Sequence, residues 1–299
     1  MADEAGAEVT EPAEEVRERK GIRKGLYLLP SAFTAANIGM GYFAVMASLR
    51  GFQLLSEGPT PEGIRMATAH FDNASRAIGW AILFDTLDGR IARMTKTTTE
   101  IGIQLDSIAD VVTFGIAPAV LIYAWGYGGA LPEGSQLHKL GWFVSFMFLI
   151  CGAIRLARFN VQAMRPRSMA EGSAKVDKKH FVGLPIPAAA GLLVALVHFA
   201  PRPLVSYEGN LPALYSVMLM GLVAILSALM VSTIRYSSFK TLGAGRRSTI
   251  KVMPVIAAVG MLVWLYSRYV LLAMILTYVL HGLVSRFFAL FRSRPAEEQ

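Results

Sequence analysis

The chain has 299 residues, of which 54% are hydrophobic and only 17% charged, and its mean hydropathy is +0.46. In a soluble domain about a quarter of the residues are charged, so this composition excludes an ordinary globular protein. The net charge of +8 would suit nucleic acid, but the basic residues gather between apolar runs, which argues against a nucleic-acid partner. The runs themselves predict an all-α, polytopic bundle of membrane helices.

The first thirty residues differ from the rest of the chain. Residues 1–15 are acidic, and we expect them to be disordered. Residues 16–30 are basic and then apolar, which predicts either an interfacial helix on an anionic membrane surface or a plain basic flank of the first span. The acidic start is unlike the basic n-region of a cleavable signal peptide, so none is expected.

Eight apolar segments follow within a single predicted transmembrane catalytic domain, residues 31–288, and residues 289–299 are expected to form a cytoplasmic tail. Two of the segments are short and the last two are nearly continuous, so the prediction is six to eight transmembrane helices, with eight favoured. The expected spans are residues 31–49, 74–94, 102–126, 140–163, 185–200, 212–231, 251–266 and 268–288.

The charges of the loops predict the orientation of the bundle. Most of the 29 Lys and Arg residues fall in alternate loops, and the positive-inside rule places those loops and both termini in the cytoplasm. The single Cys151 lies in an apolar run, so no intrachain disulfide is possible. Together with the lack of an organelle-targeting signal, these features favour a prokaryotic inner (cytoplasmic) membrane.

Four aspartates interrupt the second and third predicted spans, in their cytoplasmic halves. Asp85 and Asp88 are three residues apart, and Asp106 and Asp110 are four apart, so each pair shares one helix face. The short polar turn between the spans should make the helices antiparallel and turn the faces toward each other. A carboxylate inside a membrane helix costs at least about 2.5–3.5 kcal/mol, and Mg²⁺ and Mn²⁺ prefer oxygen ligands. The pattern therefore predicts two divalent cations, Mg or Mn, that bind phosphate oxygens.

The residues around the aspartates suit this interpretation. Gly89 and Gly102 have no side chain, so they permit close approach of a ligand or a neighbouring helix. Arg93 lies near the cytoplasmic end of its helix, where it can pair with phosphate. The alternative is a carboxylate–arginine network that only ties helices together, which explains four aspartates at this spacing poorly.

The aspartates belong to a longer motif, D-G-x2-A-R-x8-G-x3-D-x3-D, with Asp85 upstream. Its fixed positions are filled by Asp88, Gly89, Ala92, Arg93, Gly102, Asp106 and Asp110. The motif resembles the signature of the CDP-alcohol phosphatidyltransferase family. This resemblance implies a bundle of membrane helices, a CDP-linked lipid bound at the motif and a dimetal site. It also implies that Asp85, Asp88 and Asp106 are metal ligands and that Asp110 is both a ligand and the general base.

Further segments resemble the membrane-embedded phosphatidylserine synthases within that family. They are residues 28–37, 106–119, 155–160, 181–191 and 235–240, and together they cover most of the chain between Leu28 and Lys240. The resemblance implies CDP-diacylglycerol as the donor and L-serine as the acceptor, with phosphatidylserine and CMP formed by direct attack. It also makes a homodimer an expected possibility.

The predicted serine pocket lies in the fourth span. Arg155 and Arg158 share a helix face near the cytoplasmic surface, where a guanidinium can hold the carboxylate of serine in a bidentate pair. Asn160 can accept a hydrogen bond from the ammonium group. The alternative is that both arginines snorkel to lipid head groups. Arg235 and Lys240 are weaker candidates, since a plain membrane anchor explains them as well.

Two polar residues of the first span, Thr34 and Asn37, lie in its cytoplasmic half. They are candidates for contact with the nucleotide of CDP-diacylglycerol, and a helix–helix hydrogen bond is the alternative.

Two other functions remain open from the sequence. The same chemistry with another acceptor alcohol, glycerol 3-phosphate or an inositol compound, would use the same aspartates. A divalent cation transporter would also use carboxylates, but it predicts acidic residues along a transmembrane path and often an internal repeat. The sequence shows neither of these features.

Overall fold

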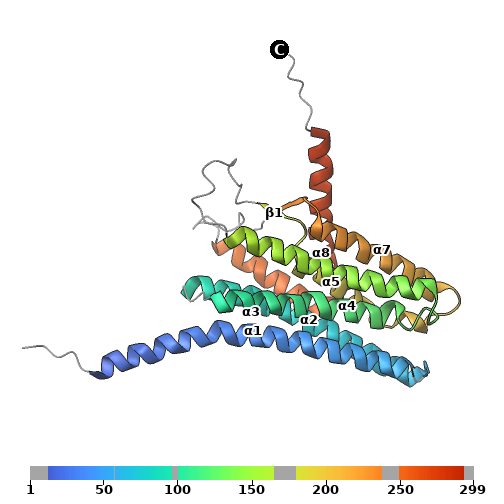
Figure 1. Cartoon of the computed structure of the whole chain (residues 1–299), viewed down its shortest axis with the longest axis horizontal. Coiled ribbons are helices and arrows are strands. Elements are labelled where there is room, and N and C mark those ends of the chain that lie inside the picture. The colour runs from blue at the N-terminus through green and yellow to red at the C-terminus, as the bar shows by residue number, and fades with distance from the viewer. Residues whose placement is uncertain (1–12, 57, 96–99, 165–179, 238–248, 293–299) are drawn as a thin grey trace, which may run out of the picture.

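The computed structural model describes residues 13–56, 58–95, 100–164, 180–237 and 249–292. Over these residues the chain is predominantly helical, which confirms the all-α prediction. The helical segments lie side by side in one bundle (Figure 1). In chain order they are α1 (Ala13–Ser56), α2 (Pro61–Thr95), α3 (Glu100–Asp110), η1 (Val111–Ile116), α4 (Ala117–Ile122), η2 (Tyr123–Tyr127), α5 (Gln136–Met164), α6 (Ile186–Phe199), η4 (Leu204–Ser206), α7 (Leu211–Val231) and α8 (Thr249–Arg292).

Six segments of the described chain are long and apolar enough to cross a membrane. They lie in α1, in the rod from α3 to η2, in α5, in α6 with the turn after it, in α7 and in α8. The protein is therefore a multi-pass membrane protein, as predicted. α2 occupies the predicted second span but is not among the six, and it carries Asp72, Asp85 and Asp88 within its length.

The two ends of the chain are described only in part. The predicted acidic tail, residues 1–15, lies mostly outside the described residues, and so does most of the predicted C-terminal tail, residues 289–299. α1 runs without interruption from Ala13 to Ser56. The basic segment 16–30 is thus continuous with the first span, and its position relative to the membrane surface stays a prediction.

Residues 100–127 form one continuous rod whose hydrogen-bonding pattern changes along its length. α-Helix in α3 and α4 alternates with π-helix in η1 and η2. Turns of π-helix have i→i+5 hydrogen bonds, are rare and occur mostly as short segments inside α-helices. η1 begins directly after Asp110, and Pro118, which has no backbone N–H, follows its end. The change in pattern therefore separates the turns that carry Asp106 and Asp110 from the buried part of the rod.

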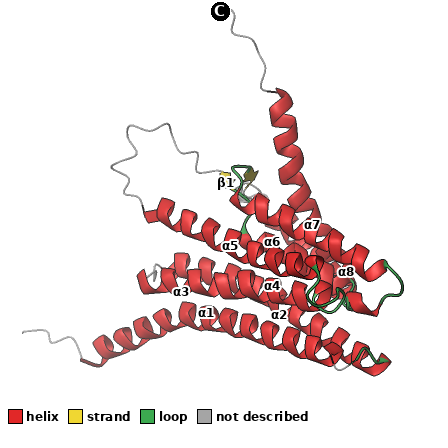
Figure 2. Cartoon of the chain, turned by 45° about the vertical axis from the view of Figure 1, so that its right-hand side comes forward, coloured by secondary structure: helices red, strands yellow, loops and turns green. Residues whose placement is uncertain are grey.

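α8 contains a break close to the boundary that the sequence predicts. Tyr266 has φ −131° and ψ 42°, so α8 consists of two helical halves. The predicted spans 251–266 and 268–288 correspond to these halves, which are joined without a loop. The final turns of α8 project away from the other helices (Figure 2).

Glycines allow the helices to approach one another closely. A Cβ atom at Gly41 of α1 would lie 2.5 Å from Oγ1 of Thr113 in η1. A Cβ atom at Gly152 of α5 would lie 2.5 Å from Cδ1 of Ile186 in α6. Around these contacts lies a core whose largest fully buried side chains include Phe71, Phe114, Tyr127, Phe148 and Leu226.

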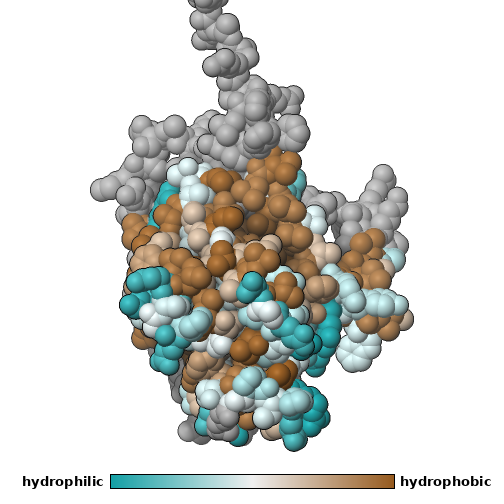
Figure 3. All heavy atoms as spheres, turned by 90° about the vertical axis from the view of Figure 1, so that its right-hand side faces the viewer, coloured by the Kyte–Doolittle hydropathy of each residue, from teal (hydrophilic) through white to brown (hydrophobic). Residues whose placement is uncertain are grey.

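The two ends of the bundle are built differently. At the end of the bundle where α6 begins and α7 ends, β1 (His180–Val182) and β2 (Arg235–Ser237) form a short antiparallel ribbon. The connections from α1 to α2, from η2 to α5 and from α6 to α7 gather at the opposite end. Figure 3 faces that end and shows hydrophilic residues on it beside a hydrophobic flank.

Candidate functional site

Three of the four predicted aspartates converge. Asp85 comes from α2, whereas Asp106 and Asp110 lie one turn apart on α3. One carboxylate oxygen from each lies within 4.8 Å of the other two, and all three side chains are partly buried. Asp88 lies almost one turn after Asp85, and its side chain is outside the part of the chain that the structure describes. The face of α2 that carries Asp85 and the face of α3 that carries Asp106 and Asp110 therefore lie together.

The cluster has the chemistry of a site for a hard cation. Oδ1 of Asp110 is buried and accepts no hydrogen bond from the described groups. A buried carboxylate oxygen without a donor is unfavourable, and three carboxylates this close together repel one another. Mg²⁺ and Mn²⁺ bind carboxylate oxygens, so a bound cation would remove both penalties. Asp85, Asp106 and Asp110 therefore fit a divalent cation.

The remaining motif residues lie on the same two helices. Gly89 of α2 is partly buried, and Gly102 lies one turn before Asp106 on α3, where it is exposed. Neither has a side chain that would occupy the space beside the carboxylates. Ala92 and Arg93 lie in the last turn of α2, but their side chains are not among those described. Their contact with a CDP-linked lipid stays a prediction.

α5 brings a guanidinium to the carboxylates. Arg155 is partly buried and interacts electrostatically with Asp110, and its Nε atom is buried without an acceptor. Nδ2 of Asn160 donates a hydrogen bond to Oγ of Ser107, at 2.8 Å, in the turn between the two aspartates of α3. Arg158 is exposed. The three predicted serine ligands therefore lie in different surroundings, and Arg155 is the one beside the carboxylates.

α1 contributes two buried polar residues, Thr34 and Asn37. Oγ1 of Thr113 in η1 donates a hydrogen bond of 3.1 Å to the backbone carbonyl oxygen of Asn37. This is a helix–helix hydrogen bond, as considered from the sequence, although the backbone of Asn37 rather than its side chain accepts it. Oδ1 of Asn37 is buried and receives no hydrogen bond from the described groups. The amide oxygen can therefore still accept a hydrogen bond from a ligand.

The two weaker candidates cannot be placed at the carboxylates. Arg235 lies in β2 opposite Val182, and its side chain is not described. Lys240 lies outside the described residues.

Three residues of the site were not singled out from the sequence. Ser107 and Thr113 fall inside the segment 106–119 that resembles phosphatidylserine synthases, so a signal for them was present. Tyr278 of α8 lies within electrostatic range of Arg155. Helix spacing relates only residues that are close in the sequence, so the proximity of Tyr278 to Arg155 could be found only in the folded structure.

Comparison with known families agrees with the geometry. The model of the family described as CDP-alcohol phosphatidyltransferase matches residues 27–227. The chain belongs to this family. The matched range contains all four aspartates of the motif and the whole of α5, and it ends within α7. α8 lies beyond the part that the CDP-alcohol phosphatidyltransferase model covers.

Similar proteins carry a more specific name, CDP-diacylglycerol–serine O-phosphatidyltransferase. One from Helicobacter pylori is 35% identical over 221 residues, which are 72% of this chain and 74% of that protein. One from Methanocaldococcus jannaschii is 40% identical over 122 residues, or 41% of this chain and 49% of that protein. One from Saccharomyces cerevisiae is 34% identical over 173 residues, or 58% of this chain and 54% of that protein.

Proposed function

We propose that this chain transfers the phosphatidyl group of CDP-diacylglycerol to the hydroxyl of L-serine, giving phosphatidylserine and CMP. The observation that carries the proposal is the carboxylate cluster of Asp85, Asp106 and Asp110. It lies in a chain of the CDP-alcohol phosphatidyltransferase family, and the similar proteins are named for serine as the acceptor.

Asp110 acts as the general base in this reaction. It accepts the proton of the serine hydroxyl, and the serine oxygen forms a bond to the phosphorus that bears diacylglycerol. The bond from that phosphorus to the oxygen of CMP breaks, and CMP leaves with the electron pair. The buried Oδ1 of Asp110, which accepts no hydrogen bond from the described groups, supports this role because a base needs an oxygen that can still accept a proton.

Asp85, Asp88, Asp106 and Asp110 would hold two divalent cations, Mg or Mn. When bound, such cations neutralise the pyrophosphate and stabilise the attacking and leaving oxygens. Asp85, Asp106 and Asp110 would also set the height of the pyrophosphate in the bundle, and the 4.8 Å within which their carboxylate oxygens lie supports this.

The donor lies along the motif in this proposal. Gly89 and Gly102 leave room for the pyrophosphate, and Arg93 pairs with it. Ala92, which follows Gly89 by three residues on α2, belongs to the same proposed donor site. Thr34 and Asn37 of α1 contact the nucleotide, and the buried amide oxygen of Asn37 supports this because it can accept from a cytosine amino group.

The acceptor lies against α5. Arg155 pairs with the carboxylate of serine, and its place beside Asp110 supports this because the hydroxyl and the carboxylate of serine are separated by only two carbons. Asn160 already donates to Ser107, so its amide oxygen is the atom that would accept from the ammonium group. Arg158, Arg235 and Lys240 would add positive charge at the approach to the site.

The protein would lie in a prokaryotic inner membrane with its termini and this site on the cytoplasmic side. The loop charges support that orientation. Cysteines placed singly at Thr233 and Glu133, in a chain with Cys151→Ser, test it. Labelling of position 233 only from the cytoplasm and of position 133 only from outside is expected, and the reverse would refute the orientation.

We also propose that the protein forms a homodimer. The mass of the detergent-solubilised protein tests this proposal, and the mass of a single chain would contradict it.

The test of the function is CMP release by the purified protein supplied with CDP-diacylglycerol, a candidate acceptor and Mg²⁺ or Mn²⁺. Release that requires L-serine, with phosphatidylserine as the lipid product, is expected. Release that requires glycerol 3-phosphate or an inositol compound instead would make the acceptor wrong. Uptake of divalent metal into proteoliposomes without release of CMP would identify a transporter.

A further inference from the structure

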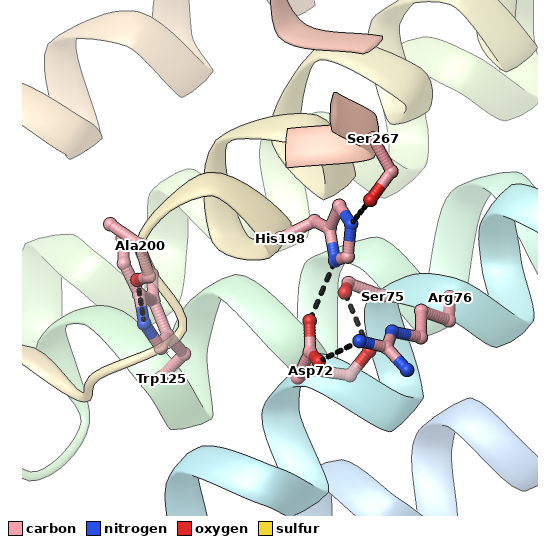
Figure 4. Close-up of polar contacts among 7 residues, drawn as sticks. All are labelled: Asp72, Ser75, Arg76, Trp125, His198, Ala200 and Ser267. Atoms are coloured by element: carbon pink, nitrogen blue, oxygen red, sulfur yellow. Dashed lines mark hydrogen bonds and ion pairs between the residues drawn. The ribbon is translucent and has the colours of Figure 1, made fainter. Parts of the chain in front are cut away.

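α8 lies outside the range that the family model matches, and three contacts determine where its second half runs. The first is a chain of hydrogen bonds at the start of that half, directly after the break at Tyr266. Nε2 of His198 and Oγ of Ser267 lie 2.9 Å apart, and Nδ1 of His198 lies 2.6 Å from Oδ1 of Asp72. This chain joins α8 to α6 and α2 (Figure 4). It lies at the end of α6 that is farther from the aspartates.

The second contact sets the direction of α8. A Cβ atom at Gly191 of α6 would lie 3.5 Å from Cδ1 of Ile275 in α8. Gly191 lies before His198 on α6, whereas Ile275 lies after Ser267 on α8. The two helices therefore run in opposite directions, and α8 returns along α6 toward the end of the bundle that holds the aspartates.

The third contact relates the beginning of α6 to Arg155. Ile186 in the first turn of α6 packs against Gly152 of α5, and Arg155 lies in the next turn of α5. Tyr278 follows Ser267 by eleven residues, which is about three turns on the same helix face and about 16 Å along the axis. That distance brings Tyr278 to the level where α6 begins, and at this level Tyr278 lies within electrostatic range of Arg155. Tyr278 is partly buried against the core.

We infer that Tyr278 is a positioning residue for the acceptor alcohol, because it orients the guanidinium of Arg155 that receives the carboxylate of serine. This inference rests on the proposed function. The electrostatic interactions of Arg155 with both Asp110 and Tyr278 support it. A phenol can accept a hydrogen bond from a guanidinium without neutralising its charge. Tyr278 thereby holds the guanidinium of Arg155 away from the carboxylate of Asp110. The positive charge of Arg155 is then available to the substrate.

The test is the steady-state kinetics of Tyr278→Phe in the full-length protein. We expect the KM for L-serine to rise about tenfold, as for a lost hydrogen bond to a charged group, while the KM for CDP-diacylglycerol stays within about twofold. Tyr269→Phe is the matched control, since Tyr269 is an exposed tyrosine on the same half of α8. It should change neither constant. An unchanged KM for serine in Tyr278→Phe, or an equal rise for both substrates, would overturn the inference.

A double-mutant cycle with Arg155→Lys separates positioning from general packing. If Tyr278 acts through Arg155, the double variant should have nearly the same KM for serine as Arg155→Lys alone. Fully additive effects would show that Tyr278 does not act through Arg155. If the wild-type protein releases CMP only with another acceptor, the proposed function has failed on the acceptor, and the same cycle applied to the KM of that acceptor still decides the role of Tyr278.

Discussion

The three aspartates of the carboxylate cluster differ in their surroundings, and this difference suggests a division of roles. Asp110 is followed directly by π-helix, has a buried oxygen without a donor and interacts with Arg155. Asp85 and Asp106 come from the helix faces that precede it in the chain. The proposed base must lie close to the acceptor, whereas a ligand only has to reach the cation. Asp110, which interacts with the proposed serine ligand Arg155, is therefore the aspartate to which we assign the role of base.

Asp110→Asn should therefore lower the rate of CMP release by about 10²–10⁴-fold, as for loss of a general base. Excess Mg²⁺ or Mn²⁺ should not restore the rate. Asp85→Asn should instead raise the metal concentration needed for half-maximal activity and be partly rescued by excess metal. Glu62→Gln, a change in a carboxylate at the start of α2, is the control and should behave as the wild type. A fully active Asp110→Asn protein would exclude Asp110 as the base.

At the scale of elements, the site depends on the contact between α1 and η1. Gly41 approaches Thr113 so closely that an added Cβ would lie 2.5 Å from Oγ1 and 3.0 Å from Cα of Thr113. Because the second of these atoms is backbone, a side-chain rotation cannot relieve the overlap. The same threonine donates a hydrogen bond to the carbonyl oxygen of Asn37. α1 and η1 are thus fixed to each other one turn from Asp110.

Gly41→Ala should lower the free energy of unfolding by about 1–3 kcal/mol, because overpacking forces backbone shifts. Thermal unfolding in detergent measures the stability, and CMP release measures the effect on the site. Gly39→Ala is the matched control on the same helix, since an added Cβ there meets nothing within 4 Å. It should leave the stability unchanged or raise it by up to about 1 kcal/mol. Equal effects of the two substitutions would contradict the proposed contact.

At the scale of the whole molecule, the hydrogen-bond chain of Asp72, His198 and Ser267 joins three helices that are distant in the sequence. Asp72 also pairs with Arg76, at 2.8 Å, so its carboxylate has partners on both oxygens. The side chains of Asp72 and His198 are largely buried. These hydrogen bonds therefore hold α8 against the bundle at the end opposite Asp85, Asp106 and Asp110.

His198→Ala should lower the free energy of unfolding by about 1–3 kcal/mol, because it leaves the buried carboxylate of Asp72 without one partner. A fall in the thermal unfolding midpoint is the expected observation. Arg65→Ala breaks an ion pair with Glu62 whose side chains are 79% and 76% exposed, and it should have almost no effect. A midpoint that His198→Ala leaves unchanged would mean that apolar contacts alone hold α8.

Local patterns account for what could be predicted from the sequence. The spacings of Asp85, Asp106 and Asp110 follow helix periodicity, so their convergence needed only two helices and a short turn. The predicted spans 251–266 and 268–288 divide α8 directly after Tyr266, the residue at which its backbone leaves helical values.

Contacts between distant segments could not be predicted in this way. His198 meets Asp72 across 126 positions, and Asn160 meets Ser107 across 53. Such pairs depend on how whole helices pack, which no local periodicity specifies. The π-helix of η1 also leaves no mark in the hydrophobic pattern of that span.

The π-helix of η1 has a consequence for how this protein can change in evolution. Its i→i+5 bonds close around one residue more than the hydrogen bonds of an α-helix, so a π-helical turn absorbs an extra residue without the rotation of roughly 100° that one residue adds to an α-helix. Removal of a single residue from 111–116 would therefore let this stretch return to α-helix, while Asp106 and Asp110 kept facing Asp85 and the apolar remainder of the rod kept its packing. Among homologues, a one-residue gap at this point would be compatible with an intact carboxylate cluster.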